Sequence, residues 1–199
     1  MKHTPLAGAL ALALVLLALP ALAGDDKAAQ TTHDQMMEAM AKAATPGPGH
    51  KVLEQMVGTW NATTTMYGEP GQPPMVSQGK MVIDMVLGGR YARMQYQSEF
   101  NGMKMEGLGF TGYDNVEKKY VSDWMDTMGT GIMRDTGTYD PATRTINSTG
   151  AMTDPMGAAW TTRSTMQLVG ADKMILEMYG RNAGAPEIKL MQIVYTRAK

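Results

Sequence analysis

The sequence predicts an all-β fold, an antiparallel meander barrel of about ten strands preceded by a short N-terminal helix. From residue 59 onward apolar side chains recur at every second position, the period of a strand with one buried face. Gly, Asn, Asp and Pro recur at hairpin spacing in the same region, so successive strands are expected to pair antiparallel. An open sheet of this size would expose two edges, and closure removes both. A two-sheet sandwich is the alternative architecture.

The N-terminal segment carries the pattern of an export signal. Lys2 and His3 precede an apolar run over residues 6–19, and Ala21-Leu22-Ala23 then offers the small-x-small pattern that signal peptidase cleaves. The run is shorter than the roughly 20 residues that cross a membrane, and no later stretch is as apolar. We therefore expect residues 1–23 to be a signal peptide cleaved near Ala23, no membrane span, and a periplasmic or secreted protein.

A leader and a short methionine-rich helix are expected before the sheet. Residues 24–32 are small and polar and predict a disordered leader. A helix from about 33 to 44 follows, and its apolar face holds Met36, Met37 and Met40. Pro46-Gly47-Pro48-Gly49 ends this helix. Residues 24–49 are therefore expected to form leader, helix and linker, and residues 50–199 the barrel domain.

A second short helical turn over residues 50–56 leads into the strands. The Gly88-Gly89 and Asn101-Gly102 pairs match two-residue hairpin turns, which require positive φ angles. The expected strands cover residues 59–67, 77–87, 90–100, 103–113, 118–126, 131–139, 143–150, 159–168, 173–181 and 187–197.

Alternation assigns an inward face to strands near both ends of this series. The inward positions are Trp60, Ala62, Thr64, Met66, Met81, Ile83, Met85, Leu87, Met94, Tyr96, Phe100, Trp160, Met166, Leu168, Met174, Leu176 and Met178. The fourth and fifth strands are ambiguous, because Glu106 shares a face with Leu108, and Asp126 shares one with Trp124. Either those strands are solvated on both faces or the interior holds polar groups.

Composition excludes several classes of protein. The chain holds 18 basic and 19 acidic side chains, a net charge of -1, which provides no field for nucleic acid. It has no Cys and only three His, so disulfides and thiol catalysis are excluded and a multi-histidine metal site is not expected. After residue 23 the sequence holds 20 methionines but only six leucines. Methionine packs adaptably in cavities, and the alternative use of its thioether is Cu(I) binding.

Two short motifs resemble those of a known barrel superfamily. Gly58-Thr59-Trp60 opens the first strand, and Tyr195-Thr196-Arg197 closes the last. Together they resemble the Gly-x-Trp signature and the last-strand Arg of lipocalins and fatty-acid-binding proteins. The resemblance implies that Trp60 closes the barrel floor with Arg197 stacked on its indole, and that Gly58, Trp60 and Arg197 have a structural role.

A longer set of motifs resembles one bacterial family. Gly112-Tyr113-Asp114-Asn115, Lys118-Lys119-Tyr120-Val121 and residues 124–130 resemble the core of domain-of-unknown-function family 1579. Pro48-Gly49-His50, Leu87-Gly88-Gly89-Arg90-Tyr91 and the motifs of the first and last strands match that family too. The resemblance covers about residues 48–197. It implies a lipocalin-like, calycin-type barrel and does not imply an activity.

The inward alternation predicts a hollow that binds a small, largely apolar molecule. Arg90 either captures a ligand carboxylate near the barrel mouth or is a surface residue beside a turn. Trp124 and Asp126 form either an inner wall or a rim. The candidate ligand-binding residues are Met81, Met85, Arg90, Met94, Tyr96, Phe100, Trp124, Asp126 and Met166.

Two other functions fit the same pattern. A low-turnover enzyme would use Asp126 or Glu106 as acid or base in the hollow, and a copper-handling protein would use the methionines of the N-terminal helix. No nucleophile elbow, phosphate loop or dinucleotide fingerprint is present. The sequence therefore indicates no catalytic residue, no metal site and no cofactor. The Asp114-Asn115 pair is expected to form an Asx-stabilised turn.

Overall fold

The computed structural model describes residues 26–68, 71–100 and 102–199. The predicted signal peptide, residues 1–23, lies outside these described residues, as does Asn101 of the predicted Asn-Gly turn. The chain divides into two compact units, Met1–Glu38 and Ala39–Lys199.

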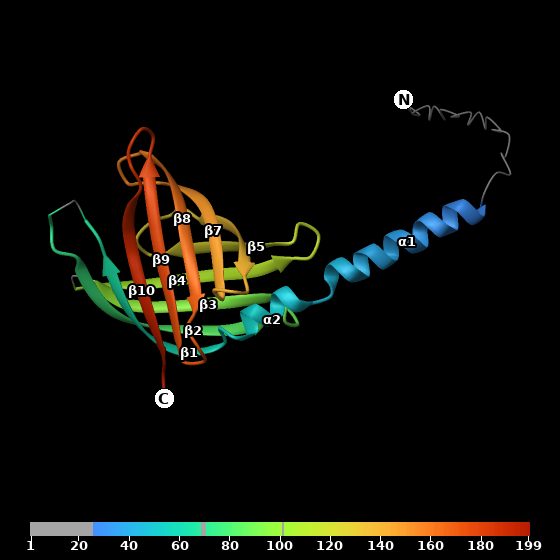
Figure 1. Ribbon diagram of the computed structural model, residues 1–199, viewed down its shortest axis with the longest axis horizontal. Coiled ribbons are helices and arrows are strands. Elements are labelled where there is room, and N and C mark those ends of the chain that lie inside the picture. Colours follow the sequence, from blue (N-terminus) through green and yellow to red (C-terminus); the bar gives the residue numbers. More distant parts are fainter. Residues whose placement is uncertain (1–25, 69–70, 101) are drawn as a thin grey trace, which may run out of the picture. The chain divides into compact units, whose positions relative to one another are not determined.

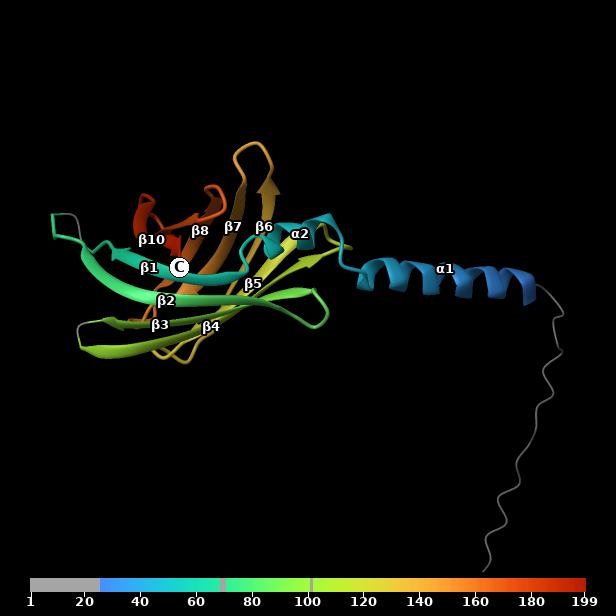
Figure 2. The same ribbon diagram turned by 90° about the horizontal axis from the view of Figure 1, so that it is seen from below.

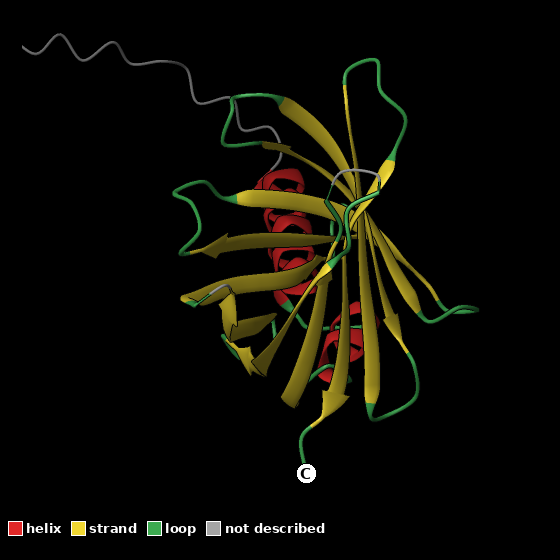
Figure 3. Cartoon of the chain, turned by 90° about the vertical axis from the view of Figure 1, so that its left-hand side faces the viewer, coloured by secondary structure: helices red, strands yellow, loops and turns green. Residues whose placement is uncertain are grey.

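Strands make up most of the described structure (Figure 3). The helices are α1 (Asp26–Ala44) and α2 (Pro48–Glu54). The strands, labelled in Figure 1, are β1 (Gly58–Met66), β2 (Met75–Val86), β3 (Tyr91–Phe100), β4 (Met103–Asp114), β5 (Lys119–Asp126), β6 (Met133–Asp140), β7 (Thr145–Thr153), β8 (Ala159–Leu168), β9 (Lys173–Asn182) and β10 (Ile188–Arg197). Helix α1 begins at Asp26 rather than at 33, so it includes residues 26–32 of the expected leader, which contain no Gly or Pro to interrupt the helix.

The strands form one closed antiparallel barrel. Each strand pairs with the next one along the chain, and β1 pairs with β10 through a ladder from Trp60↔Arg197 to Met66↔Met191. The predicted meander barrel is therefore confirmed, and the sandwich alternative is wrong. Closure pairs the two edges that an open sheet would expose.

The ladders assign the inner faces of β4 and β5. Met94 is buried on β3, and it pairs with Gly109 on β4, which pairs with Trp124 on β5. Cross-strand partners share a face of a sheet, so Trp124 faces the interior. Glu106 belongs to the opposite face of β4 and is exposed. Asp126 pairs with Gly107 on the same face as Trp124, so the barrel interior holds this carboxylate and not that of Glu106.

One predicted inward position, Leu87, is wrong. The turn between β2 and β3 covers residues 87–90 rather than two residues, because Val86 pairs with Tyr91. Leu87 is the first of three successive turn residues with positive φ, and its side chain is 72% exposed. Met66, the last residue of β1, pairs with the inward Met191 and so lies on the predicted face, although it is 39% exposed because the wall ends there.

Helix α2 covers one end of the barrel, beside β2, β3 and β4 (Figure 2). Leu53 of α2 is fully buried, and Met56 just beyond the helix is buried as well. The Met56 carbonyl accepts a 2.9 Å hydrogen bond from the Nε1 of Trp60, which is itself 1% exposed. This end, where β1 starts, is therefore closed.

Arg197 stacks on Trp60 at the closed end of the barrel. Its guanidinium carbon lies 4.1 Å from the centroid of the Trp60 ring. The guanidinium nitrogens donate to the carbonyls of Val57 and Ala171 at 2.9 to 3.0 Å. Gly58 has a φ of 139°, and a Cβ at this position would collide with the Arg197 guanidinium. Glycine at position 58 thus permits both the backbone conformation and the stacking.

The start of α2 is held by a buried histidine. The Gly47 N–H donates to Nδ1 of His50 at 3.0 Å, and the edge of the His50 ring contacts Tyr113. His50 is 4% exposed, and Nδ1 accepts a hydrogen bond only while it carries no proton. Burial lowers the pKa of His50, the charge of Arg90 acts in the same direction, and Glu54 acts against them.

Acidification is therefore expected to destabilise this protein through His50. The neutral ring is favoured in the folded state, so the unfolded chain binds more protons below the ordinary histidine pKa of about 6.5, and stability falls as the pH drops below that value. Urea unfolding at pH 7.5 and 5.5 measures the change. His50→Gln is expected to reduce the difference between the two pH values. An equal difference in wild type and variant would show that another group controls it.

The Asx turn expected at Asp114 is confirmed, since its carboxylate accepts from the Val116 and Glu117 N–H groups at 2.7 and 3.0 Å. The neighbouring Asn115 has an additional role. Its Nδ2 donates to the carbonyls of Ala43 and Thr45 at 3.0 and 2.8 Å, so it caps the C-terminal end of α1.

Candidate functional site

The two ends of the barrel interior differ in burial. Inward side chains near α2 are buried: Trp60, Ile83, Ala92, Tyr120, Leu168, Met174 and Tyr195. Inward side chains toward the other end keep accessible surface: Met105, Trp124, Met133, Met152, Trp160 and Met191. Met166 and Leu176, which pair with each other two residues from the Leu168–Met174 pair, also keep some. We call the half of the interior away from α2 the open half.

Methionine dominates the apolar part of this interior. Among the predicted lining residues, Met81, Met94 and Tyr96 are buried, while Met85 and Met166 are partly buried against them. Phe100 is the last residue of β3, and its side chain lies outside the described residues. Unbranched thioether side chains change rotamer easily, so the shape of this wall is adaptable.

Trp124 is fixed flat against the wall of the open half. Its Nε1 donates to Asp126 at 2.9 Å, and the other Asp126 oxygen accepts from the Met128 N–H at 2.9 Å. A Cβ at Gly107 or Gly109 would collide with the indole, so the two glycines of β4 make room for it. The Asp126 carboxylate is occupied in positioning the Trp124 ring.

Asp135 on β6 forms an unpredicted polar cluster with two hydroxyl residues of β8. The Ser164 hydroxyl donates to one Asp135 oxygen at 3.3 Å. The other oxygen, Oδ1, and the Thr162 hydroxyl are buried and have no hydrogen-bond partner among the described residues. Gly150 pairs with both Asp135 and Thr162, and a Cβ there would collide with the carboxylate. The wall is therefore shaped around this carboxylate.

The surroundings of Asp135 disfavour its charged form. Burial raises the pKa of Asp135, and the hydroxyls of Ser164 and Thr162 act against this effect. Leaving a buried acceptor unpaired costs about 1–3 kcal/mol of folding free energy. A group that destabilises the empty fold and lies on the inner wall is a candidate for ligand contact.

Cationic side chains are kept out of the open half. On the described strands, Lys and Arg lie on the outer face, except Arg197 beneath Trp60. The structure places Arg90 in the turn at the α2 end, where it donates to the Leu87 carbonyl at 3.0 Å. Arg90 is therefore not brought together with Trp124 and Asp126. The open half carries the carboxylates of Asp126 and Asp135.

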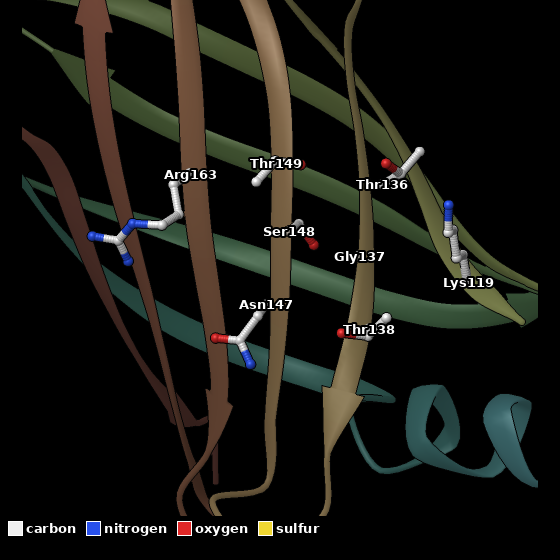
Figure 4. Close-up of a pocket in the computed structure, with 8 residues that line it drawn as sticks. All are labelled: Lys119, Thr136, Gly137, Thr138, Asn147, Ser148, Thr149 and Arg163. Atoms are coloured by element: carbon white, nitrogen blue, oxygen red, sulfur yellow. The ribbon is translucent and has the colours of Figure 1, made fainter. Parts of the chain in front are cut away.

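A shallow depression of about 310 Å³ lies on the outer face of the barrel wall (Figure 4). Its lining residues are Lys119, Thr136, Gly137, Thr138, Asn147, Ser148, Thr149 and Arg163. The Arg163 guanidinium is already paired with Glu187 at 2.7 Å and lies over the Tyr179 ring. This depression includes none of the predicted site residues, and its strongest binding group is occupied.

Metal and membrane signatures are not found in the described part of the chain. No group of three or more His, Cys, Asp or Glu side chains there is placed to hold a metal ion, and no helix there is long and apolar enough to cross a membrane. Met36, Met37 and Met40 of α1 are exposed. Copper binding by these methionines stays a prediction.

The architecture is that of a closed antiparallel meander barrel with a helix-covered floor. The chain belongs to the family described as "Protein of unknown function (DUF1579)", whose sequence model matches residues 45–197. The predicted family is therefore confirmed. No curated protein matches significantly in sequence.

Solved structures match the barrel to different degrees. The crystal structure of Rv2717c from M. tuberculosis superposes with a TM-score of 0.56 at 16% identity, over 78% of this chain and 100% of that one. A redesigned β-barrel matches with a TM-score of 0.38 at 15% identity, over 74% of this chain and 96% of that one. The protein EF1p2_mFAP2b, bound to DFHBI, matches with a TM-score of 0.39 at 12% identity, over 75% and 98%. The similarity to Rv2717c supports the fold alone.

Proposed function

We propose that this protein is exported and binds a small, largely apolar molecule in the open half of its barrel. The observation that carries the proposal is the inward-facing set of methionine and tryptophan side chains that keep accessible surface away from α2. In a closed barrel such surface faces the interior or its mouth. Apolar lining with a few placed polar groups is typical of small-molecule sites. The N-terminal signal-peptide pattern supports export.

Binding rather than catalysis is the function that the carboxylates favour. Glu106 is exposed on the outer face, and both oxygens of Asp126 are engaged by Trp124 and Met128. Neither is arranged as an acid or base for a bound substrate. One Asp135 oxygen is buried and has no hydrogen-bond partner among the described residues, which suits pairing with a polar group on a guest.

The test uses the protein purified from the periplasm of an expressing bacterium. Its intact mass is expected to show an N-terminus near Gly24. The neutral probe N-phenylnaphthylamine is expected to bind with increased fluorescence. Met166→Trp, which fills the interior, is expected to weaken this binding by about tenfold or more. Gln167→Trp places the same ring on the outer face and is expected to have little effect.

Circular dichroism shows whether each variant is folded, and Leu176→Trp replaces Met166→Trp if that variant unfolds. Absence of probe binding by wild type, or equal binding by folded interior and outer-face variants, would contradict an interior site. An uncleaved N-terminus on cytoplasmic protein would contradict export.

A further inference from the structure

We propose that the molecule bound in the barrel carries a positively charged amine, which pairs with Asp135 and Thr162. This inference rests on the proposed function and specifies the chemistry of the ligand. It predicts that the barrel discriminates against fatty acids, although their apolar chains suit the same lining.

The polar cluster at Asp135 is incompletely hydrogen-bonded among the described residues. Ser164 supplies a single donor to Asp135 Oδ2, and Oδ1 has no partner among the described residues. A carboxylate only accepts hydrogen bonds, whereas the unpaired Thr162 hydroxyl both donates and accepts. Thr162 is 1% exposed and belongs to the inner face of β8. Ser164 and Thr162 each offer the carboxylate one neutral hydroxyl donor, whereas an ammonium group supplies three donors and a positive charge.

The polar cluster has no positively charged neighbour on the inner face of the described strands. The neighbouring strands present Ser122 on β5 and Ser148 on β7 to the interior, and neither is charged. The nearest basic residues on these strands point outward, where Arg134 pairs with Asp123 and Arg163 pairs with Glu187. No Lys or Arg of the described strands therefore compensates Asp135 within the open half. A ligand cation would supply the missing charge, and a ligand carboxylate would be repelled.

The polar cluster lies beside an apolar part of the inner wall. Ser122 pairs with Asp135, and Trp124, two residues along β5, pairs with Met133, so the indole and the carboxylate are neighbours on one wall. Met152 and Trp160 pair with each other at the next inward positions of β7 and β8 toward the mouth. A molecule with one amine and an alkyl chain thus finds an acidic contact beside an apolar surface.

The test compares three ligands that carry an alkyl chain of the same length and differ in their polar group. Decylammonium, decanol and decanoate are each used at pH 7 to displace N-phenylnaphthylamine from the purified protein. Decylammonium is expected to bind about tenfold or more tighter than decanol, as charge-assisted hydrogen bonds require, and decanoate more weakly than decanol. Asp135→Asn is expected to bring the amine-to-alcohol ratio close to one, and Thr162→Val to reduce it.

Asp123→Asn removes a carboxylate from the outer face of the neighbouring strand, β5. This variant is expected to retain the preference for decylammonium over decanol. If the probe binds but decanoate competes as well as decylammonium, the inference is overturned and the proposed function stands. The same holds if the ratio is equal in wild type, Asp135→Asn and Thr162→Val. Failure of the wild-type protein to bind the probe overturns the proposed function itself.

Discussion

Replacing Trp60 by alanine is expected to lower the free energy of unfolding by about 3–5 kcal/mol. The indole is 1% exposed, so its removal leaves a cavity under the barrel floor. The change also removes the donor to the Met56 carbonyl and the ring on which Arg197 stacks. Urea unfolding followed by far-ultraviolet circular dichroism measures the loss.

The matched control is Trp160→Ala at the other end of the barrel. Trp160 is only partly buried, and its Nε1 donates to Asp154 near the mouth at 3.1 Å. The loss of stability there is expected to be clearly smaller than for Trp60→Ala. Equal losses would mean that the floor and the mouth contribute alike, contrary to the burial difference between them.

Gly109→Val is expected to displace Trp124 from the wall. A Cβ at this position would lie 2.8 Å from Cε3 of the indole and 2.9 Å from Cε of Met94, so one of them must move. Overpacking of this kind destabilises a fold by about 1–3 kcal/mol. We expect a shifted tryptophan emission and weaker binding of N-phenylnaphthylamine, because the displaced ring enters the open half.

Gly131→Val is the control for this substitution, since nothing lies within 4 Å of a Cβ at Gly131. It is expected to leave the emission maximum and the unfolding midpoint near those of wild type. If Gly109→Val behaves like Gly131→Val, Trp124 is not held against β4 in solution.

The barrel was predictable from the sequence because its signals are local. Alternation and turn residues predicted strands at 103–113 and 159–168, and the structure has Met103–Asp114 and Ala159–Leu168. The turn at Leu87 was not predictable in the same way. A Gly-Gly pair permits positive φ but does not set the loop length, and here Leu87 also adopts positive φ.

The polar part of the interior was harder to predict because it depends on cross-strand register. Asp135 interrupts the apolar alternation, and its neighbours Thr162 and Ser164 lie on β8, two strands away. Gly107 and Gly109 carry no side chain, so β4 showed its outward apolar residues more clearly than its inward ones. Two glycines at alternate positions of a strand were the available signal, since they indicate that a neighbouring group approaches closely.

The pairing of β1 with β10 brings the two ends of the sheet together. Arg197 at the end of β10 lies opposite Trp60, near the start of β1. A peptide bridge between these two ends would preserve every ladder, and the chain would then start at any hairpin exposed to solvent. The order in which the strands are synthesised is thus independent of the barrel that they form.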